Sequence, residues 1–374
     1  MDITLLDLQI YWWLLVSIIG ALFVFMTFVQ GGQTLLYTLA KSDVERDLLV
    51  NSLGRKWELT FTGLVMFGGA LFAAFPLFYA VSFGGAYFVW MAILFCFIIQ
   101  AVSYEYRKKP DNVYGERFYE ILLYINGSLG IFLIGVALGT LFSGANFSVN
   151  DMNLSKWTTN YGGLEALLNP FNIAFGLMLV FLARVQGALY FLNSLDALEI
   201  TQRVKAVVSS NFLIFLALFI YILVTILFQD GYVYDAKSGQ VSIASMKFLH
   251  IFLELPLLLL SLIVGIVLLV YGVYIALFKE SQKAIFFTGS GTVITVTILL
   301  FILGIHQSVF YPSLSDMQSS LTIQNSSGSY YTLSVMAIVS LLVPIVLGYI
   351  FAVWRSMDKT KLTIDEIQSD SHHY

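Results

Sequence analysis

Two short stretches place ionisable side chains where apolar segments begin or end. In GRKWELTFTG, Trp57 and Glu58 open an apolar run, and in SYEYRKK, Glu105 and Arg107 close another. A carboxylate at membrane depth can take up and release protons, because partial burial shifts its pKa. We therefore expect these four residues to line a proton pathway. The alternative is that Glu58 is only a first-turn anion favoured by the helix dipole, while Glu105 and Arg107 form a surface ion pair.

Three further polar residues lie inside apolar runs and predict polar contacts in the protein interior: Gln30, Arg184 and Gln186. Arg184 follows the helix-starting Asn-Pro at 169–170 by 14 residues, about 21 Å along a helix. Its guanidinium could reach the membrane surface. It could equally pair with a carboxylate or with a propionate of a partner's cofactor, because arginine binds carboxylates with two parallel hydrogen bonds.

Histidine and cysteine are too scarce to predict a redox centre held by this chain. Cys96 is the only cysteine, so neither a disulfide nor a thiolate metal site can be built within the chain. Of the four histidines, His250 and His306 flank apolar runs, and His372 and His373 lie near the C-terminus. A haem ligated by His250 and His306 is the less favoured interpretation. We expect no metal site, no securely bound cofactor and no identifiable cofactor-binding residue.

The composition is that of an integral membrane protein. Hydrophobic residues make up 59% of the 374 residues and charged residues only 11%, with a mean hydropathy of +0.84. No basic stretch precedes the first apolar segment, so we expect it to remain as a helix and not to act as a cleaved signal peptide. There is no phosphate-binding glycine loop, and nothing indicates a nucleic-acid partner. We expect one polytopic domain, 1–358, and a polar cytoplasmic tail, 359–374.

Nine runs are long enough to cross a bilayer, which takes about 20 apolar residues per helix. We place these spans at 10–30, 59–80, 84–104, 119–142, 170–193, 206–228, 252–278, 285–305 and 331–354.

Fifteen of the 19 Lys and Arg residues then fall after the odd-numbered spans. Lys156, Lys237 and Lys247 lie on the other side, and Arg184 lies within span five. Since cytoplasmic loops carry the excess of cations, the N-terminus is expected outside and the C-terminus in the cytoplasm. The fold class is all-α, arranged as two four-helix bundles and one peripheral helix.

Several motifs together resemble subunit II of cytochrome bd quinol oxidases, over nearly the whole chain. They are YWWLLV at 11–16, the Trp-acid pair followed by GGALFAAFP, SYEYRKK, NPFNIAFGL, QGALYFL, and the pattern YPSLSDMQSSLTIQNSSGSYYTLSVMAIVSLLVPIVLGY. Two departures matter. Gln30 stands where many members carry an aspartate, and LTFTG replaces a more polar element after Glu58, which itself stands for an aspartate.

The resemblance implies a heterodimer in the bacterial plasma membrane. Subunit I binds haems b and d and oxidises quinol, while this chain scaffolds it and contributes to cytoplasmic proton uptake as O2 is reduced to water. Quinol and membrane lipid are the other expected partners. A structurally bound quinone and a small single-span accessory subunit are left open, as is the choice between ubiquinol and menaquinol. The competing interpretation is a secondary transporter that couples through Glu58 and Arg184. A third is a scaffold with no role in proton movement.

Overall fold

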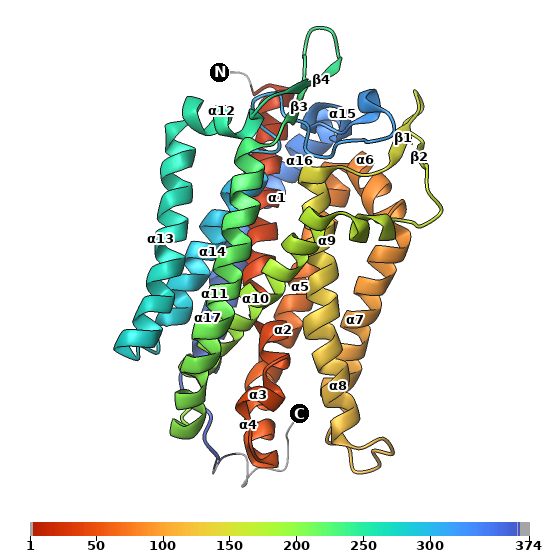
Figure 1. Ribbon diagram of the computed structural model, residues 1–374. Helices are drawn as coiled ribbons and strands as arrows, with labels where there is room; N and C mark the ends of the chain where they lie inside the picture. The colour runs from red at the N-terminus through yellow and green to blue at the C-terminus, as the bar shows by residue number, and fades with distance from the viewer. Residues whose placement is uncertain (1–2, 365, 367–374) are drawn as a thin grey trace.

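The computed structural model describes residues 3–364 and 366, and it is almost entirely helical (Figure 1). The helices are α1 Leu5–Met26, α2 Phe28–Gln33, α3 Leu36–Leu39, α4 Asp43–Gly54, α5 Trp57–Ala74, α6 Pro76–Tyr79, α7 Tyr87–Tyr106, α8 Glu116–Ile125, α9 Ile131–Ser143, α10 Pro170–Ser194, α11 Leu198–Phe228, α12 Lys247–Glu254, α13 Pro256–Lys279, α14 Ala284–Phe301, α15 Ile323–Ser326, α16 Tyr330–Ser340 and α17 Val343–Met357. Four short helical turns complete them: η1 Ala80–Gly84, η2 Asn126–Gly130, η3 Leu164–Leu168 and η4 Met317–Ser319.

The described part of the chain contains nine helical segments that are long and apolar enough to cross a membrane, which confirms the predicted number. They are Leu5–Gln33, Asp43–Ala74, Tyr87–Tyr106, Glu116–Ser143, Pro170–Ser194, Leu198–Phe228, Pro256–Lys279, Ala284–Phe301 and Tyr330–Met357. Each contains most of one predicted span. The two-bundle arrangement and the direction of insertion remain predictions.

Prolines account for the main differences at the ends of the predicted spans. The span predicted over 252–278 is interrupted at Leu255, where α12 ends and Pro256 begins α13. The span predicted over 59–80 likewise breaks at Phe75, before Pro76 starts α6. Proline lacks a backbone N–H and disfavours helical backbone in the residue before it, so a helix ends there and a new one begins.

The segment between the first two predicted spans is helical, although its polar sequence predicts a connecting loop. Ser42 caps the start of α4 by accepting a hydrogen bond from the Glu45 N–H. The apolar face of this otherwise polar helix, which includes Leu48, Leu49 and Leu53, is completely buried. Helix α4 therefore packs under the ends of the spans, at the end of the molecule that we call the α4 end (Figure 1).

Helices approach closely where glycine faces a neighbouring backbone. A Cβ atom on Gly31 of α2 would lie 1.8 Å from the carbonyl oxygen of Ala183 on α10, and one on Gly127 of η2 would lie 2.2 Å from the carbonyl oxygen of Gln30. Small residues allow such contact between helices in membranes. Helix α2 is therefore held between α10 and η2.

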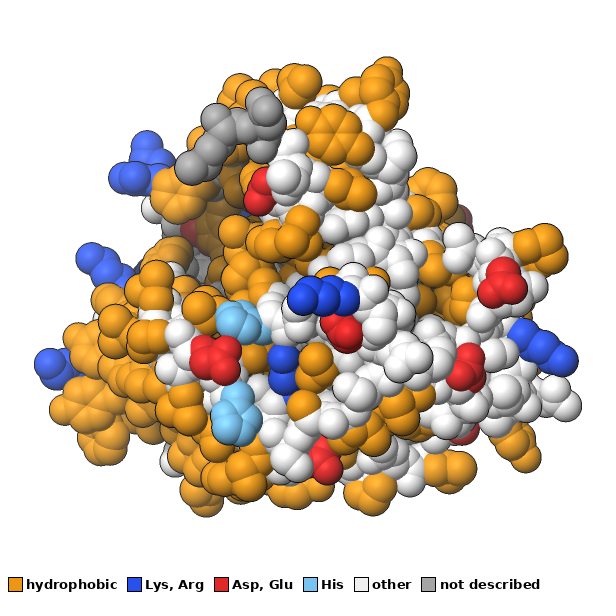
Figure 2. Space-filling view, turned by 90° about the horizontal axis from the view of Figure 1, so that it is seen from above, with side chains coloured by type: hydrophobic (Ala, Val, Ile, Leu, Met, Phe, Trp, Pro, Cys, Tyr) orange, Lys and Arg blue, Asp and Glu red, His pale blue; other side chains and the backbone are white. Residues whose placement is uncertain are grey.

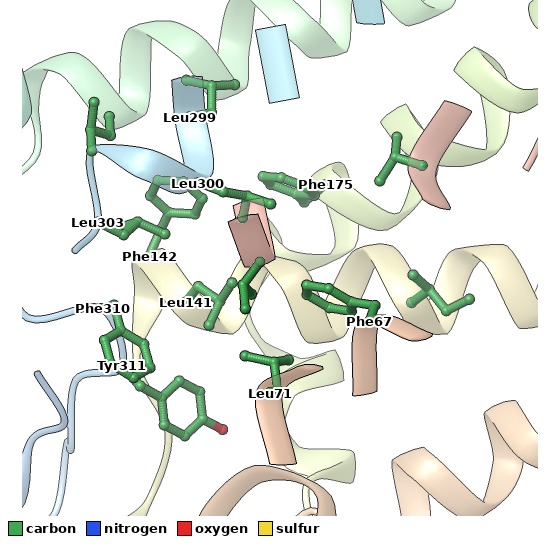
Figure 3. Packing of buried hydrophobic residues seen from close by; sticks show 14 of the residues in the cluster. Phe67, Leu71, Leu141, Phe142, Phe175, Leu299, Leu300, Leu303, Phe310 and Tyr311 are labelled. Atoms are coloured by element: carbon green, nitrogen blue, oxygen red, sulfur yellow. The ribbon is translucent and has the colours of Figure 1, made fainter. Parts of the chain in front are cut away.

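Apolar side chains from helices far apart in sequence form the main core. In Figure 3, Phe67 and Leu71 of α5 lie close to Leu141 of α9, and Phe175 of α10 lies close to Leu300 of α14. Dispersion contacts are small individually and large in sum, so this packing fixes the relative positions of the spans.

The opposite end, which we call the hairpin end, carries the only strands in the described residues. Strand β1 Phe147–Val149 pairs with β2 Ser155–Trp157, and β3 Gly231–Tyr234 pairs with β4 Val241–Ala244, both antiparallel. Figure 1 shows both hairpins above the helices. The ninth span differs from the others, because α17 has no buried residue.

Candidate functional site

Glu58 lies in the first turn of α5 and is exposed at the α4 end. No hydrogen bond or ion pair joins it to another described residue. Helix α5 begins after Lys56, which supplies no side-chain cap, so the carboxylate also interacts favourably with the uncapped helix start. Glu58 is thus a free carboxylate on the surface of this chain, and the helix-dipole interpretation also holds for its position.

Trp57 turns inward beside Glu58 and stacks on Tyr104 of α7. Their rings are 5.6 Å apart with an interplanar angle of 14°. The Tyr104 hydroxyl accepts a hydrogen bond from the Gln33 amide at 3.2 Å, while the indole N–H of Trp57 is buried without a partner among the described residues. This stack fixes the start of α5 against α7.

Lys56, on the other side of Trp57, is fully buried and ties the C-terminal segment to this region. Its ammonium group lies 2.9 Å from Asp358 Oδ1 and 5.2 Å from the centre of the Trp354 ring. Leu362, in the predicted polar tail, is 3% exposed and bridges to Leu195 beyond α10. The start of the tail therefore packs against the protein. Residues 365 and 367–374 of the predicted tail lie outside the described residues.

Arg107 is the centre of a buried charged cluster and is only 1% exposed. It donates to Glu120 Oε1 from Nε at 3.1 Å and from Nη2 at 2.7 Å, and Nη2 also lies 2.6 Å from Asp47 Oδ1. Lys108 bridges Asp47 at 2.9 Å and Glu116 at 2.8 Å. Helices α4, α7 and α8 are joined here by ion pairs, and Arg107 is buried where the alternative interpretation placed it in a surface pair.

Glu105 has a different environment from Arg107 although the two are close in sequence. It is exposed and pairs with Lys109 at 3.0 Å, one turn along the chain. An exposed pair of this kind contributes little to stability. Glu105 is therefore in a surface ion pair whose partner is Lys109, and no contact brings it to Glu58.

Tyr37 extends the charged cluster toward α3 by donating a hydrogen bond to Glu120 Oε2. Burial and this hydrogen bond raise the pKa of Tyr37 to about 12. Its hydroxyl therefore stays protonated at neutral pH and remains a donor to Glu120. Arg46 also approaches Glu120, at 3.5 Å, so this one carboxylate is shared by several donors.

Buried amides occupy the interior above the charged cluster. Gln30 donates to Gln100 Oε1 at 2.7 Å, and both side chains are fully buried. Asn126 of η2 is also fully buried, and neither of its side-chain polar atoms has a partner among the described residues. Gln30 thus makes an interior polar contact, and its partner is the amide of Gln100.

Arg184 and Gln186 also make interior contacts, each with neutral groups. Arg184 donates from Nε to Asn211 Oδ1 at 2.7 Å and from Nη1 to Thr34 Oγ1 at 2.9 Å. Gln186 donates to Thr292 Oγ1 at 2.6 Å. No contact joins Arg184 to Glu58, so the structure does not bring together the two residues on which the transporter interpretation depends.

The two histidines considered as haem ligands lie at the hairpin end. His306 Nδ1 is 3.2 Å from Glu254 Oε2, and both side chains are substantially exposed. Figure 2 shows this end with charged and histidine side chains scattered among other groups. Within the described ranges, no three His, Cys, Asp or Glu residues lie close enough to hold a metal ion.

Several residues of this region were not selected by the sequence analysis as site residues. They are Gln33, Asp47, Lys56, Gln100, Tyr104, Glu120, Asn126 and Asp358. A signal existed for Gln100 and Glu120, since each is polar within an apolar run. No sequence signal indicated the pairing of Arg107 with Asp47, because 60 residues separate them.

These features define a multi-pass α-helical membrane protein that has a free carboxylate and a buried charged cluster at one end. The family model for the cytochrome bd terminal oxidase subunit II matches residues 8–357. The chain belongs to this family, as its motifs led us to expect.

Curated relatives match along nearly their full length. The Cytochrome bd-I ubiquinol oxidase subunit 2 of Escherichia coli K12 is 28% identical, covering 98% of each chain. The Cytochrome bd ubiquinol oxidase subunit 2 of Bacillus subtilis is 26% identical, covering 90% of this chain and 92% of the relative. The structure of bd oxidase from Geobacillus thermodenitrificans includes a chain with a TM-score of 0.60 at 10% identity, covering 93% of this chain and 98% of that one, which is a likeness of fold.

Proposed function

We propose that this chain is subunit II of a heterodimeric quinol oxidase that reduces O2 to water in the bacterial plasma membrane. The family match carries this proposal, and the names of the relatives from E. coli and B. subtilis support ubiquinol as the electron donor. Haems b and d would be held by subunit I and would supply the electron transfer and oxygen chemistry. This chain would supply a scaffold and a route for protons.

The α4 end would face the cytoplasm. The loops after the first, third, fifth and seventh spans and the C-terminal segment hold fifteen of the 19 Lys and Arg residues, and this asymmetry favours a cytoplasmic location. Glu58 and the Arg107 cluster would then meet the compartment from which protons are taken.

A stripe on α5 would dock against subunit I. Glu58, Thr62, Val65, Gly69 and Phe72 are all exposed and recur every three or four residues, so they share one face of the helix. Gly69 has no atom within 4 Å of where a Cβ would lie, which leaves room for a close approach. An apolar groove between α5 and α7 lies alongside this stripe, lined in part by Phe61, Leu94 and Tyr87.

Glu58 would accept protons from the cytoplasm and release them toward subunit I. Its position at the α4 end of the docking stripe supports this role, because water and the partner subunit would meet there. Trp57 would hold the start of α5 through its stack on Tyr104, and the Arg107 cluster would hold α7 relative to α4 and α8. Glu105 would lie at the water-facing side of the same end.

The subunit assignment is tested by purifying the complex through an affinity tag on this chain and recording its visible spectrum. Bands of b- and d-type haem should co-purify. Gly69→Ala should retain them, and Gly69→Phe should lose them because the larger side chain blocks the close approach. Purified chain without haem bands would contradict the subunit assignment, and haem retention by Gly69→Phe would contradict the docking stripe alone.

A further inference from the structure

Arg184 has an unused part of its guanidinium group inside a membrane span. It donates hydrogen bonds only to neutral groups, from Nε to Asn211 and from Nη1 to Thr34. Nη2 has no hydrogen-bond partner among the described residues. It is also not one of the fully buried side-chain nitrogen and oxygen atoms that lack a partner. The side chain is partly exposed, so this nitrogen can be reached from outside the chain.

The charge of Arg184 is not balanced by a carboxylate among the described residues. No carboxylate lies within 4.0 Å of it in the part of the chain that the structure describes, whereas Arg46, Arg107 and Arg203 each have one. A cation at membrane depth is costly unless it is paired, hydrated or drawn to the interface. Asn211 and Thr34 supply hydrogen-bond acceptors without supplying negative charge.

The position of Arg184 gives access to one leaflet. Ser194, where α10 ends at the α4 end, is ten residues away, about 15 Å along the helix. Thr34 precedes Tyr37 by three residues, about one helical turn, and Tyr37 contacts the charged cluster through Glu120. Through Thr34 the guanidinium lies about one helical turn from Tyr37, so a lipid headgroup must be drawn inward from the membrane surface to reach it.

We propose that Arg184 binds the phosphate of an anionic phospholipid from the cytoplasmic leaflet. A phosphate oxygen would accept hydrogen bonds from Nη2, because the planar guanidinium suits phosphate geometry. The exposed aromatic ring of Tyr124, which lies close enough to interact electrostatically with Arg184, suits the headgroup region. Lys41, exposed just after α3 and without an ion pair among the described residues, adds positive potential at the α4 end.

A lipid is favoured over a carboxylate of subunit I by the position of the site. The hydrogen bonds of Arg184 go to Thr34, just after α2, and to Asn211 of α11, whereas the proposed docking stripe is the exposed face of α5, which points away from the helices that α5 packs on. The choice of a lipid over subunit I rests on the proposed function, because that function sets where subunit I docks. The unbalanced charge of Arg184 comes from the structure itself.

The test compares phospholipid retained by purified wild-type complex, Arg184→Gln and Arg184→Lys, with Arg117→Gln as the matched control for an exposed cation on α8. Phosphatidylglycerol measured by mass spectrometry should fall in Arg184→Gln and stay unchanged in Arg117→Gln. Arg184→Lys should need about fivefold less added phosphatidylglycerol than Arg184→Gln to recover, which is roughly the effect of one cation near a membrane surface. Equal retention in wild type and Arg184→Gln would overturn the proposal.

A second measurement separates the possible anions and does not depend on the variants folding. Delipidated wild-type complex is titrated with vesicles of phosphatidylglycerol, vesicles of phosphatidylcholine, or inorganic phosphate, and its thermal midpoint is followed. Only phosphatidylglycerol should raise the midpoint. An equal rise with phosphatidylcholine or inorganic phosphate would overturn the lipid assignment. Loss of subunit I from Arg184→Gln with unchanged lipid would overturn the lipid assignment and identify a carboxylate of subunit I as the partner. Haem bands recorded for the wild-type complex test the subunit assignment separately from the lipid assignment.

Discussion

Arg107 donates two hydrogen bonds to the same oxygen of Glu120, from Nε at 3.1 Å and from Nη2 at 2.7 Å, while both side chains are at most 2% exposed. Their proximity joins the end of α7 to the start of α8. Asp47 adds a third helix, α4, to the same guanidinium group. The pair therefore fixes the end of the molecule at which Glu58 lies.

Removing the charge of Glu120 should destabilise the protein strongly. In Glu120→Gln, Arg107 stays buried and loses its principal partner, and breaking a buried pair costs about 3 kcal/mol or more. The thermal midpoint of the purified complex should fall clearly. Glu105→Gln, which breaks only the exposed pair with Lys109, should cost less than about 1 kcal/mol. Equal midpoints for the two variants would show that the cluster is not a stabilising contact.

The ion pair of Lys56 with Asp358 should anchor the ninth span. Helix α17 has no buried residue, so its attachment relies on contacts at the α4 end, including those of Lys56 with Asp358 and Trp354. Asp358→Asn should speed amide hydrogen exchange across α17. Lys359→Gln, which changes an exposed neighbour, is the control. Unchanged exchange in Asp358→Asn would mean that other contacts hold this span.

Gly31 and Gly69 should respond differently to alanine. A Cβ on Gly31 would meet the Ala183 carbonyl oxygen at 1.8 Å, whereas one on Gly69 would meet nothing within 4 Å. Gly31→Ala should therefore separate α2 from α10 and cost about 1–3 kcal/mol in stability. Gly69→Ala should be neutral or slightly stabilising, since alanine favours helix. The comparison is made on detergent-solubilised protein, and a stable Gly31→Ala would refute the close contact.

Tyr311 should titrate late, because burial raises its pKa from 10.0 to about 12. The neutral phenol is favoured in the folded state, so its contribution to stability is fully present below pH 10. This contribution is lost as the pH rises toward 12. The tyrosinate absorbance difference between wild type and Tyr311→Phe should appear only near pH 12. A difference that titrates near pH 10 in folded protein would contradict this burial.

Hydropathy and charge predicted the number of spans because both act locally along the chain. Helix α4 was missed because its composition is polar and its apolar face becomes recognisable only when Leu48, Leu49 and Leu53 meet the spans. The breaks at Pro76 and Pro256 have local causes and could have been predicted more sharply.

The site was less accessible to sequence reasoning because its contacts are long-range. Arg107 appeared in a cationic run typical of a membrane surface, yet Asp47 and Glu120 bury it. For Arg184 the sequence left open a contact with the membrane surface or with a carboxylate, and its actual neighbours Asn211 and Thr34 are distant in sequence. Only the exposed position of Glu58 follows simply from its place at the start of a span.

The most direct test of the proposed proton role is quinol-driven oxygen consumption by the purified complex carrying Glu58→Gln, with Glu105→Gln as the matched control and the haem spectrum recorded for both. We expect Glu58→Gln to keep its haem bands and lose turnover tenfold or more, which corresponds to about 1.4 kcal/mol of barrier. Glu105→Gln should keep most of its turnover. Unchanged turnover in Glu58→Gln would contradict the proton role and leave this subunit as a scaffold.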